Sequence, residues 1–270
     1  MSIRRSWFTA LAFVALALSL AFLTIPVIAI FTNASPGDLV SALGQHDARE
    51  ALWLSLRTSL AALAIIIVVG TPAAYLLATR NFRGRSLVLT SIELPLVMPP
   101  AVAGIALLAA FGPEGILGGA IDDAGIELVL QTAGVIVALT FVAAPFYMRQ
   151  AVAAFSALDR SWLEAARTLG AGPARAFLTV AVPSARAGLA AGTALAWGRA
   201  LGEFGATLMF AGSFPGITQT APLAIFARFS DPDGFTAALA LSAVLIAVSG
   251  ALLLTVKLAA GERALETRGL

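Results

Sequence analysis

The chain contains six apolar runs, each long enough to cross a lipid bilayer as a helix. The hydrocarbon core of a bilayer is about 30 Å thick, which takes about 20 helical residues at about 1.5 Å each. Inside that core only helices and closed barrels satisfy their backbone groups, and these runs lack the alternation of a strand. We therefore expect an all-α membrane protein with six transmembrane helices, over residues 7–31, 52–79, 86–111, 128–148, 189–212 and 236–256.

Composition agrees with this expectation. Of the 270 residues, 59% are hydrophobic and 12% are charged, whereas soluble domains carry about 25% charged residues. The first run follows Arg4 and Arg5, as a signal peptide would, but it is longer than the core of about 7 to 15 residues that signal peptides use. We therefore keep it as a helix and expect residues 1–270 to form one transmembrane domain.

Missing residue types exclude several kinds of chemistry. The chain has no cysteine, which rules out disulfides, thiolate metal sites and cysteine nucleophiles. Lys257 is the only lysine, and it follows Val256, so no G-x-x-x-x-G-K-[ST] loop is available for nucleotide phosphates. The single histidine, His46, lies in a polar segment and suits neither a histidine metal cage nor a catalytic triad. We predict a chain that is not an enzyme, without its own cofactor, metal or ATPase site.

The basic residues fall mainly on one side of the predicted membrane. Short loops that carry excess Lys and Arg stay in the cytoplasm. A cytoplasmic N-terminus places 13 of the 17 basic residues inside, namely Arg4, Arg5, Arg80, Arg83, Arg85, Arg149, Arg160, Arg167, Arg175, Arg186, Lys257, Arg263 and Arg268. We expect a multi-pass protein of the plasma (inner) membrane with both termini in the cytoplasm. Anionic lipid then explains the pI of 9.7 without nucleic acid as a partner.

The longest cytoplasmic loop, between the fourth and fifth runs, is predicted to form a helical hairpin over residues 159–183. Ser161 and Glu164 have the spacing of a capping box, and Gly170 suits the end of that helix. Pro173 suits the first turn of a second helix, which we expect to end near Pro183. The apolar face with Trp162 and Leu169 has two possible partners, the protein's own bundle or another protein.

This loop resembles the EAA loop of ABC importer permeases, E-A-A-x3-G-x9-I-x-L-P. The matching positions, with Val180 for Ile and Val182 for Leu, are Glu164, Ala165, Ala166, Gly170, Val180, Val182 and Pro183. The resemblance implies the type I importer permease architecture. It also implies that the hairpin docks on a separate ATPase dimer, which binds ATP and moves the membrane helices.

The fifth run carries two ionisable residues, Arg199 and Glu203, four positions apart. On one helical face they can pair, either as a self-neutralising pair that locks helix packing or as a pathway position that meets an anion. Gly198 and Gly202 form a G-x-x-x-G step that allows another helix to approach closely. Thr207, one turn further, is a hydroxyl donor.

The third run is interrupted by prolines. Pro99 and Pro100 predict a kink, which either curves the helix around the bundle or lines a cavity. Glu93 lies about two turns inside the cytoplasmic boundary of this run. We expect it to pair with an arginine of that face and assign it no further role.

Three segments resemble molybdate transporter permeases: residues 94–104, 199–212 and 215–225. With the EAA loop, the resemblance covers residues 51–257. It implies a homodimeric pathway for an oxyanion, most readily molybdate, fed by an extracytoplasmic oxyanion-binding protein. A dianion needs donors along a low-dielectric path, and Arg199 and Thr207 supply them in the fifth run.

Other interpretations remain open at this point. Sulfate permeases carry a related R-A-x-G-E-F-G sequence, so sulfate and tungstate are alternative cargoes. A secondary transporter would need its own ion-coupling site, and a membrane enzyme would need a cluster of nucleophile, base or metal ligands that the sequence does not offer. The residues after Lys257 are too few for a regulatory domain, so we expect no product sensing through one.

Overall fold

The computed structural model describes residues 3–266, which form helices and connecting loops with no strand among them. Four helices are long and apolar enough to cross a membrane, and they confirm the first, second, fourth and sixth predicted spans. These are α1 (Ile3–Asn33), α3 (His46–Thr79), α7 (Thr132–Ser156) and α13 (Phe235–Glu266).

The third and fifth predicted spans are each broken in two, so the prediction of one helix per span is wrong there. The third span forms α4 (Arg85–Val97) and α5 (Pro100–Phe111). Met98 and Pro99 between them are extended, because a residue before proline avoids the helical region and proline lacks the amide hydrogen that would continue the helix. The fifth span forms α10 (Val182–Leu201) and α11 (Gly205–Ala211). Six crossings stay a prediction.

The helix of the fourth span is longer than the predicted span. The sequence predicts residues 128–148, but α7 ends at Ser156, so Arg149 lies two turns inside the helix and not at its boundary. The charge of Arg149 does not end the helix, because the residues after it, up to Phe155, include neither glycine nor proline. The shorter helices are α2 (Pro36–Gly44), α6 (Gly118–Asp123), α8 (Arg160–Thr168), α9 (Pro173–Ala176), the π-helix η1 (Phe177–Ala181) and α12 (Ala221–Ser230).

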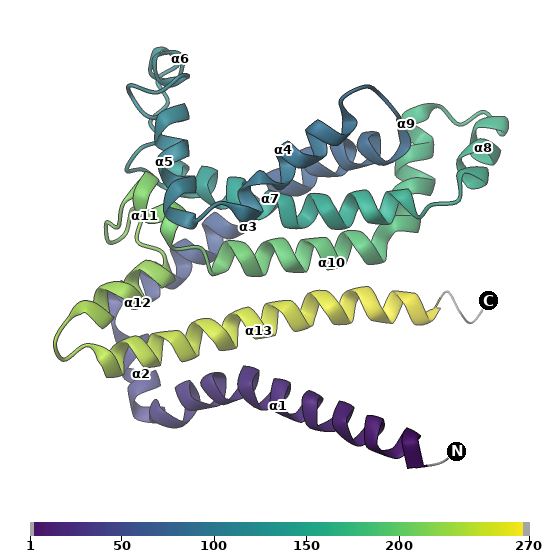
Figure 1. The fold of residues 1–270 in the computed structure, drawn as a ribbon. Helices are drawn as coiled ribbons and strands as arrows, with labels where there is room; N and C mark the ends of the chain where they lie inside the picture. The colour runs from purple at the N-terminus through teal and green to yellow at the C-terminus, as the bar shows by residue number, and fades with distance from the viewer. Residues whose placement is uncertain (1–2, 267–270) are drawn as a thin grey trace.

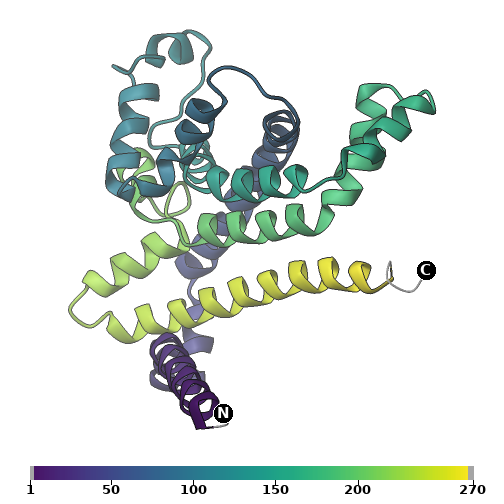
Figure 2. The same ribbon diagram turned by 45° about the vertical axis from the view of Figure 1, so that its right-hand side comes forward.

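Helices α3, α7 and α10 form the centre of the bundle, and α13 lies beside α10 (Figure 1). Helix α1 is the outermost; it contacts α13 and diverges from it toward the start of α1 (Figure 1). Figure 1 shows that the start of α1 and the end of α13 lie toward the same end of the molecule as α8 and α9, while α2, α6 and α12 lie toward the other end. In Figure 2 α1 is seen nearly end-on. The hairpin, the start of α1 and the end of α13 therefore lie toward one side of the molecule, and the cytoplasmic position of the termini stays a prediction.

The core between the central helices is built from small and medium apolar residues, including Ala62, Val135, Leu139, Ala143 and Ala196. Helix α3 adds a polar attachment to each of three other helices. The backbone N–H of Ala221 donates to the hydroxyl of Ser55 at 2.7 Å, and the indole N–H of Trp197 donates to the hydroxyl of Ser59 at 3.1 Å. The hydroxyls of Thr71 and Tyr147 are hydrogen-bonded at 2.6 Å. These bonds fix α3 against α12, α10 and α7.

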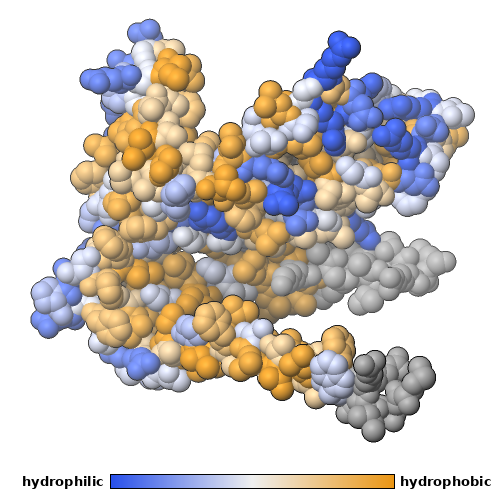
Figure 3. Space-filling view, in the orientation of Figure 1, coloured by the Kyte–Doolittle hydropathy of each residue, from blue (hydrophilic) through white to orange (hydrophobic). Residues whose placement is uncertain are grey.

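Most of the outer surface is apolar. Figure 3 shows hydrophobic residues over the flanks of the bundle and hydrophilic residues gathered at the hairpin end and at the tips of the opposite end. The most apolar stretch of α1 is exposed along its whole length, with side chains such as Phe22 and Leu23 standing clear of the bundle. Surfaces of this kind fit lipid or a second protein and do not fit water.

Candidate functional site

The hairpin begins with α8, and its N-terminus is capped differently from the prediction. The carboxylate of Asp159 accepts a hydrogen bond from the backbone N–H of Ser161 at 2.9 Å, and α8 starts at Arg160. The predicted capping box of Ser161 and Glu164 is therefore wrong. An aspartate two residues earlier is the better acceptor for the free N–H groups, and this bond lowers the pKa of Asp159 below its ordinary value.

Helix α8 ends where the sequence predicts, at Gly170. The backbone N–H of Gly170 donates to the carbonyl of Arg167 at 2.9 Å, and that of Ala171 donates to the carbonyl of Ala166 at 3.0 Å. These two bonds form a Schellman motif, which requires a left-handed residue. Gly170 supplies it with a φ of +84°, a conformation that costs any residue with a side chain.

The second arm of the hairpin starts at Pro173, as predicted, but it does not end near Pro183. Helix α9 continues through η1 into α10 without a break. In η1 the N–H of Val182 donates to the carbonyl of Phe177, a bond five residues long, and this wider turn makes room for the ring of Pro183. The second arm of the hairpin and α10 are consequently one uninterrupted helical segment, which bends between α9 and α10 (Figure 1).

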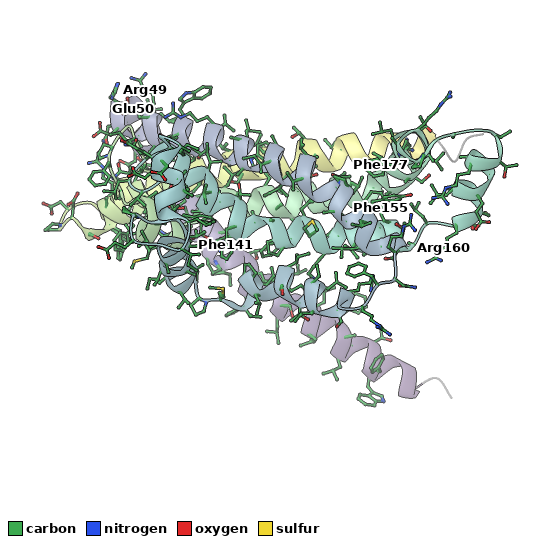
Figure 4. All side chains as sticks on the ribbon, turned by 90° about the horizontal axis from the view of Figure 1, so that it is seen from above. Arg49, Glu50, Phe141, Phe155, Arg160 and Phe177 are labelled. Carbon is green, nitrogen blue, oxygen red and sulfur yellow. The ribbon has the colours of Figure 1, made fainter. Side chains whose placement is uncertain are left out.

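Three aromatic rings pack together where the hairpin joins the bundle. Tyr75 of α3 lies 5.4 Å from Phe155 of α7 and 4.9 Å from Phe177 of η1, between ring centroids, and the two phenylalanines lie 6.2 Å apart. Figure 4 shows Phe155 and Phe177 at the same end of the bundle as Arg160, opposite Arg49 and Glu50. The cluster joins the hairpin to two central helices, and the sequence analysis missed it because its members lie far apart in the chain.

The sequence left open whether the apolar face of α8 packs on the protein's own bundle or on another protein, and in the structure only part of it packs on the bundle. Leu163 is buried against the bundle, whereas Trp162 is 56% exposed and Leu169 is 89% exposed. Glu164 and Ala165 are exposed as well. Helix α8 thus packs on the bundle with one side and leaves a mixed apolar and acidic side uncovered within this chain.

Arg199 and Glu203 form the predicted ion pair, with 2.5 Å between Arg199 Nη2 and Glu203 Oε2. They do not share a continuous helix, because α10 ends at Leu201 and Glu203 lies in the break. The second oxygen of Glu203 accepts the backbone N–H of Ala206 at 2.7 Å, near the start of α11. The carboxylate therefore connects the last turn of α10 to the first turn of α11.

Burial separates the two members of this pair. The side chain of Glu203 is 1% exposed and that of Arg199 is 27% exposed. Thr207 is fully buried, and its hydroxyl has no hydrogen-bond partner among the residues that the structure describes. This geometry favours the interpretation of Arg199 and Glu203 as a packing pair over that of a position open to cargo.

The predicted close approach at Gly198 and Gly202 is not formed within this chain. A Cβ added at Gly198 would lie 3.8 Å from Leu253, an ordinary contact, and contact with a second subunit there stays a prediction. The tight contacts lie elsewhere: a Cβ at Gly188 would lie 2.5 Å from Cβ of Ala154 on α7, and Gly192 is similarly close to α7. Gly188 and Gly192 have the same G-x-x-x-G spacing, which was a signal available in the sequence.

The prolines of the third span produce a second tight contact. Pro100 opens α5 beside Gly205 of α11, where an added Cβ would lie 2.6 Å from the proline Cβ. Gly104 of α5 lies equally close to Met209. The two broken spans thus pack against each other at their breaks.

Glu93 pairs with an arginine, as the sequence predicts, and the partner is Arg149 at 3.3 Å between Oε1 and Nε. Both side chains are open, with 47% and 62% of their surfaces exposed. They line a cavity of about 190 Å³ between α4 and α7. Among the described residues no group of His, Asp and Glu is placed to hold a metal ion.

Solved structures with the same fold are transporters. The chain superposes on a bacterial alginate ABC transporter in complex with alginate pentasaccharide-bound periplasmic protein, with a TM-score of 0.76 and 16% identity, covering 94% of each chain. The MetNI methionine ABC transporter in inward-facing conformations gives a TM-score of 0.56 and 19% identity, covering 78% of this chain and 92% of the other. Both share the arrangement of helices, and the fold is therefore that of ABC importer permeases.

Sequence relatives are more specific. The molybdenum transport system permease protein ModB of Mycobacterium tuberculosis is 38% identical over 238 residues, which cover 88% of this chain and 89% of the relative. The ModB protein of Escherichia coli K12 is 36% identical and covers 74% and 88% of the two chains. The sulfate transport system permease protein CysW of the same organism is 34% identical, with coverage of 81% and 76%.

Residues 66–258 match the family described as binding-protein-dependent transport system inner membrane component. This range contains the hairpin, both broken spans and most of the central helices. The chain belongs to the family of binding-protein-dependent transport system inner membrane components.

Proposed function

We propose that this chain is the membrane-spanning permease subunit of an ATP-driven ABC importer for an oxyanion, and that its cargo is molybdate. The observation that carries the proposal is the 38% identity to a molybdenum transport permease over 88% of the chain. Two copies form the translocation pathway, with a pair of separate ATPase subunits at the hairpin end. An extracytoplasmic binding protein delivers the oxyanion to the opposite end.

The hairpin is the coupling element in this proposal. The uncovered side of α8, with Glu164, Ala165 and Trp162, docks in a cleft of the ATPase. A capped helix joined to an uninterrupted helical segment transmits a displacement, whereas a flexible loop would absorb it. The bent helical segment of α9, η1 and α10 follows α8 and leads to Arg199, with Pro183 near its hairpin end. Ala166 and Gly170 belong to the first arm of the hairpin, where Gly170 follows the end of α8.

Orientation follows from the same arrangement. The hairpin, the start of α1 and the end of α13 lie toward one end of the bundle, which we place in the cytoplasm of a cell with this protein in its inner membrane. ATP binding draws the two hairpins together and turns the bundle outward to receive the oxyanion, and hydrolysis returns it inward. The permease core of residues 51–257 carries these movements.

The choice of cargo is tested by reconstitution. The chain, its cognate ATPase and the binding protein are placed in proteoliposomes, and ATP-driven uptake of molybdate, tungstate and sulfate is compared at equal concentration. We expect molybdate to be taken up best. Sulfate is the second candidate because a sulfate permease is 34% identical, and preferred uptake of sulfate would overturn the cargo while leaving the importer in place.

The coupling role is tested at Gly170. Gly170→Val places a β-branched residue at a φ of +84°, and we expect ATP-driven uptake to be lost while membrane insertion is retained. No atom lies within 4 Å of the added Cβ, so the effect comes from the backbone and not from a clash.

The matched control is Gly172→Val. Gly172 has a φ of −65° and a ψ of 164°, which valine adopts readily, and it also has no atom near an added Cβ. We expect this variant to transport normally. Normal uptake by Gly170→Val, measured beside it in the same vesicles, would remove Gly170 from the coupling mechanism.

A further inference from the structure

Helix α4 carries a polar stripe that the fold leaves uncovered. Ser86, Thr90 and Glu93 are spaced by four and three residues, so they lie on one face of the helix, and all three are exposed. Helix α4 has no buried residue and rests on the bundle through Leu89 and Ile92. A polar face of this kind does not fit hydrocarbon.

Arg149 completes this face from α7. Glu93 lies eight residues after the start of α4, and Arg149 lies seven residues before the end of α7, which places both about 10–12 Å inside the helix ends. Charged groups at such depth in a membrane protein face a partner or a water-filled cavity. The Glu93–Arg149 pair keeps 47% and 62% of its side-chain surface open, beside the cavity of about 190 Å³.

We propose that this α4–α7 face lines the inner, water-filled part of the translocation pathway, and that Arg149 is the cation that a passing oxyanion contacts there. This inference rests on the proposed function and names the residue at which the cargo is met. Glu93 approaches Arg149 at Nε, at 3.3 Å, and the arginine side chain is still 62% exposed, so its guanidinium is accessible to a tetrahedral oxyanion.

Energetics distinguish Arg149 from Arg199. An exposed ion pair is worth about 0.2–1 kcal/mol, so a dianion can displace Glu93 and leave again. Arg199 instead pairs with the carboxylate of Glu203, which is 1% exposed, and separating the two would leave that charge buried without a partner. A conduit needs the weak, reversible contact, and Arg149 provides it.

The test uses the absence of cysteine from this chain, so that label on its band reports the single introduced thiol. Thr90→Cys lies on the polar stripe, and Val88→Cys lies on the opposite side of α4, closer to the helix start. In vesicles of the assembled complex with the cytoplasmic side accessible, both are treated with a membrane-impermeant, negatively charged thiosulfonate. We expect Thr90→Cys to react about tenfold faster, because the reactive thiolate forms in water and not in an apolar environment.

Three other outcomes would overturn the proposal. Reaction of Thr90→Cys with a lipid-soluble maleimide alone would place the stripe in lipid. Protection from both reagents until the protein is denatured would mean that another protein surface covers it. Equal rates at Thr90→Cys and Val88→Cys would also contradict a water-lined face.

Cargo contact is tested in the same preparation. Sodium molybdate, at about twice its dissociation constant for the proposed contact at Arg149, should slow the labelling of Thr90→Cys by about threefold relative to sodium chloride of equal ionic strength. The protection should vanish when Arg149→Gln is added and should survive in Arg149→Lys. Protection that is unchanged by Arg149→Gln would remove Arg149 as the contact.

Failure of this inference is distinguishable from failure of the proposed function. If the wild-type complex takes up molybdate and Thr90→Cys is inert, the importer stands and the water-lined face is wrong. If the labelling pattern holds and the complete complex takes up no oxyanion, the proposed function is wrong.

Discussion

Replacing Arg199 with methionine is expected to destabilise the protein by about 3–5 kcal/mol and to abolish transport. The substitution keeps an unbranched, flexible side chain but removes the guanidinium, which leaves the carboxylate of Glu203 buried at 1% exposure without its cation. An uncompensated buried charge carries a penalty of this size. The measurement is thermal unfolding of the purified chain in detergent, with ATP-driven uptake in parallel.

Glu203→Gln is the asymmetric control. It removes the charge from the buried member and keeps an amide oxygen that can accept the N–H of Ala206, while Arg199, at 27% exposure, can still reach polar surroundings. We expect a smaller loss than for Arg199→Met, and partial recovery in the double variant relative to Arg199→Met alone. If Arg199→Met unfolds at the wild-type temperature, the pair does not hold the break between α10 and α11.

Gly104→Ala is expected to destabilise the protein by about 1–3 kcal/mol, which is the usual cost of extra volume in a packed core. The added Cβ would lie 2.6 Å from Cβ of Met209 and 2.8 Å from the carbonyl oxygen of Ala206, and neither of these is the free end of a flexible side chain. The methyl group would force α5 away from α11. Thermal unfolding and uptake should both report this change.

The matched control is the same substitution at Gly250. This residue lies in α13, and an added Cβ there has no atom within 4 Å. Alanine also favours a helix over glycine by about 1 kcal/mol, so Gly250→Ala should be neutral or slightly stabilising. A Gly104→Ala protein as stable as the Gly250→Ala protein would contradict the close packing of the two broken spans.

The sequence was informative where local chemistry decides the structure. Apolar runs predicted the long helices, the position of Gly170 predicted the end of α8, and the spacing of Glu93 from the boundary predicted its arginine partner. Each of these depends on residues a few positions apart or on the lipid environment as a whole.

The sequence was misleading where distant segments decide. It placed the end of the fourth span at Arg149, because it treated a charge as a membrane boundary when the helix continues to Ser156. It did not anticipate that Glu203 would bridge two helices, since a four-residue spacing is the same whether or not the helix is broken. The contact of Tyr75 with Phe177, 102 positions along the chain, has no local signal at all.

These features combine into one mechanical route. In the proposed mechanism the uncovered side of α8 meets the ATPase and α10 carries movement to the break at Glu203, while the aromatic cluster packs the base of the hairpin against α3 and α7. The broken spans on either side of that break pack together through Gly104 and Gly205. A displacement at the hairpin can therefore change the packing of the pathway helices without unfolding them.

The central claim is that force from a separate ATPase moves this chain. It is tested most directly by comparing uphill oxyanion uptake in proteoliposomes that hold the chain and the binding protein, with and without the ATPase and ATP. Uptake that appears only when both ATPase and ATP are present is the predicted result. Uphill uptake by the chain without the ATPase would contradict the claim and would indicate a secondary transporter.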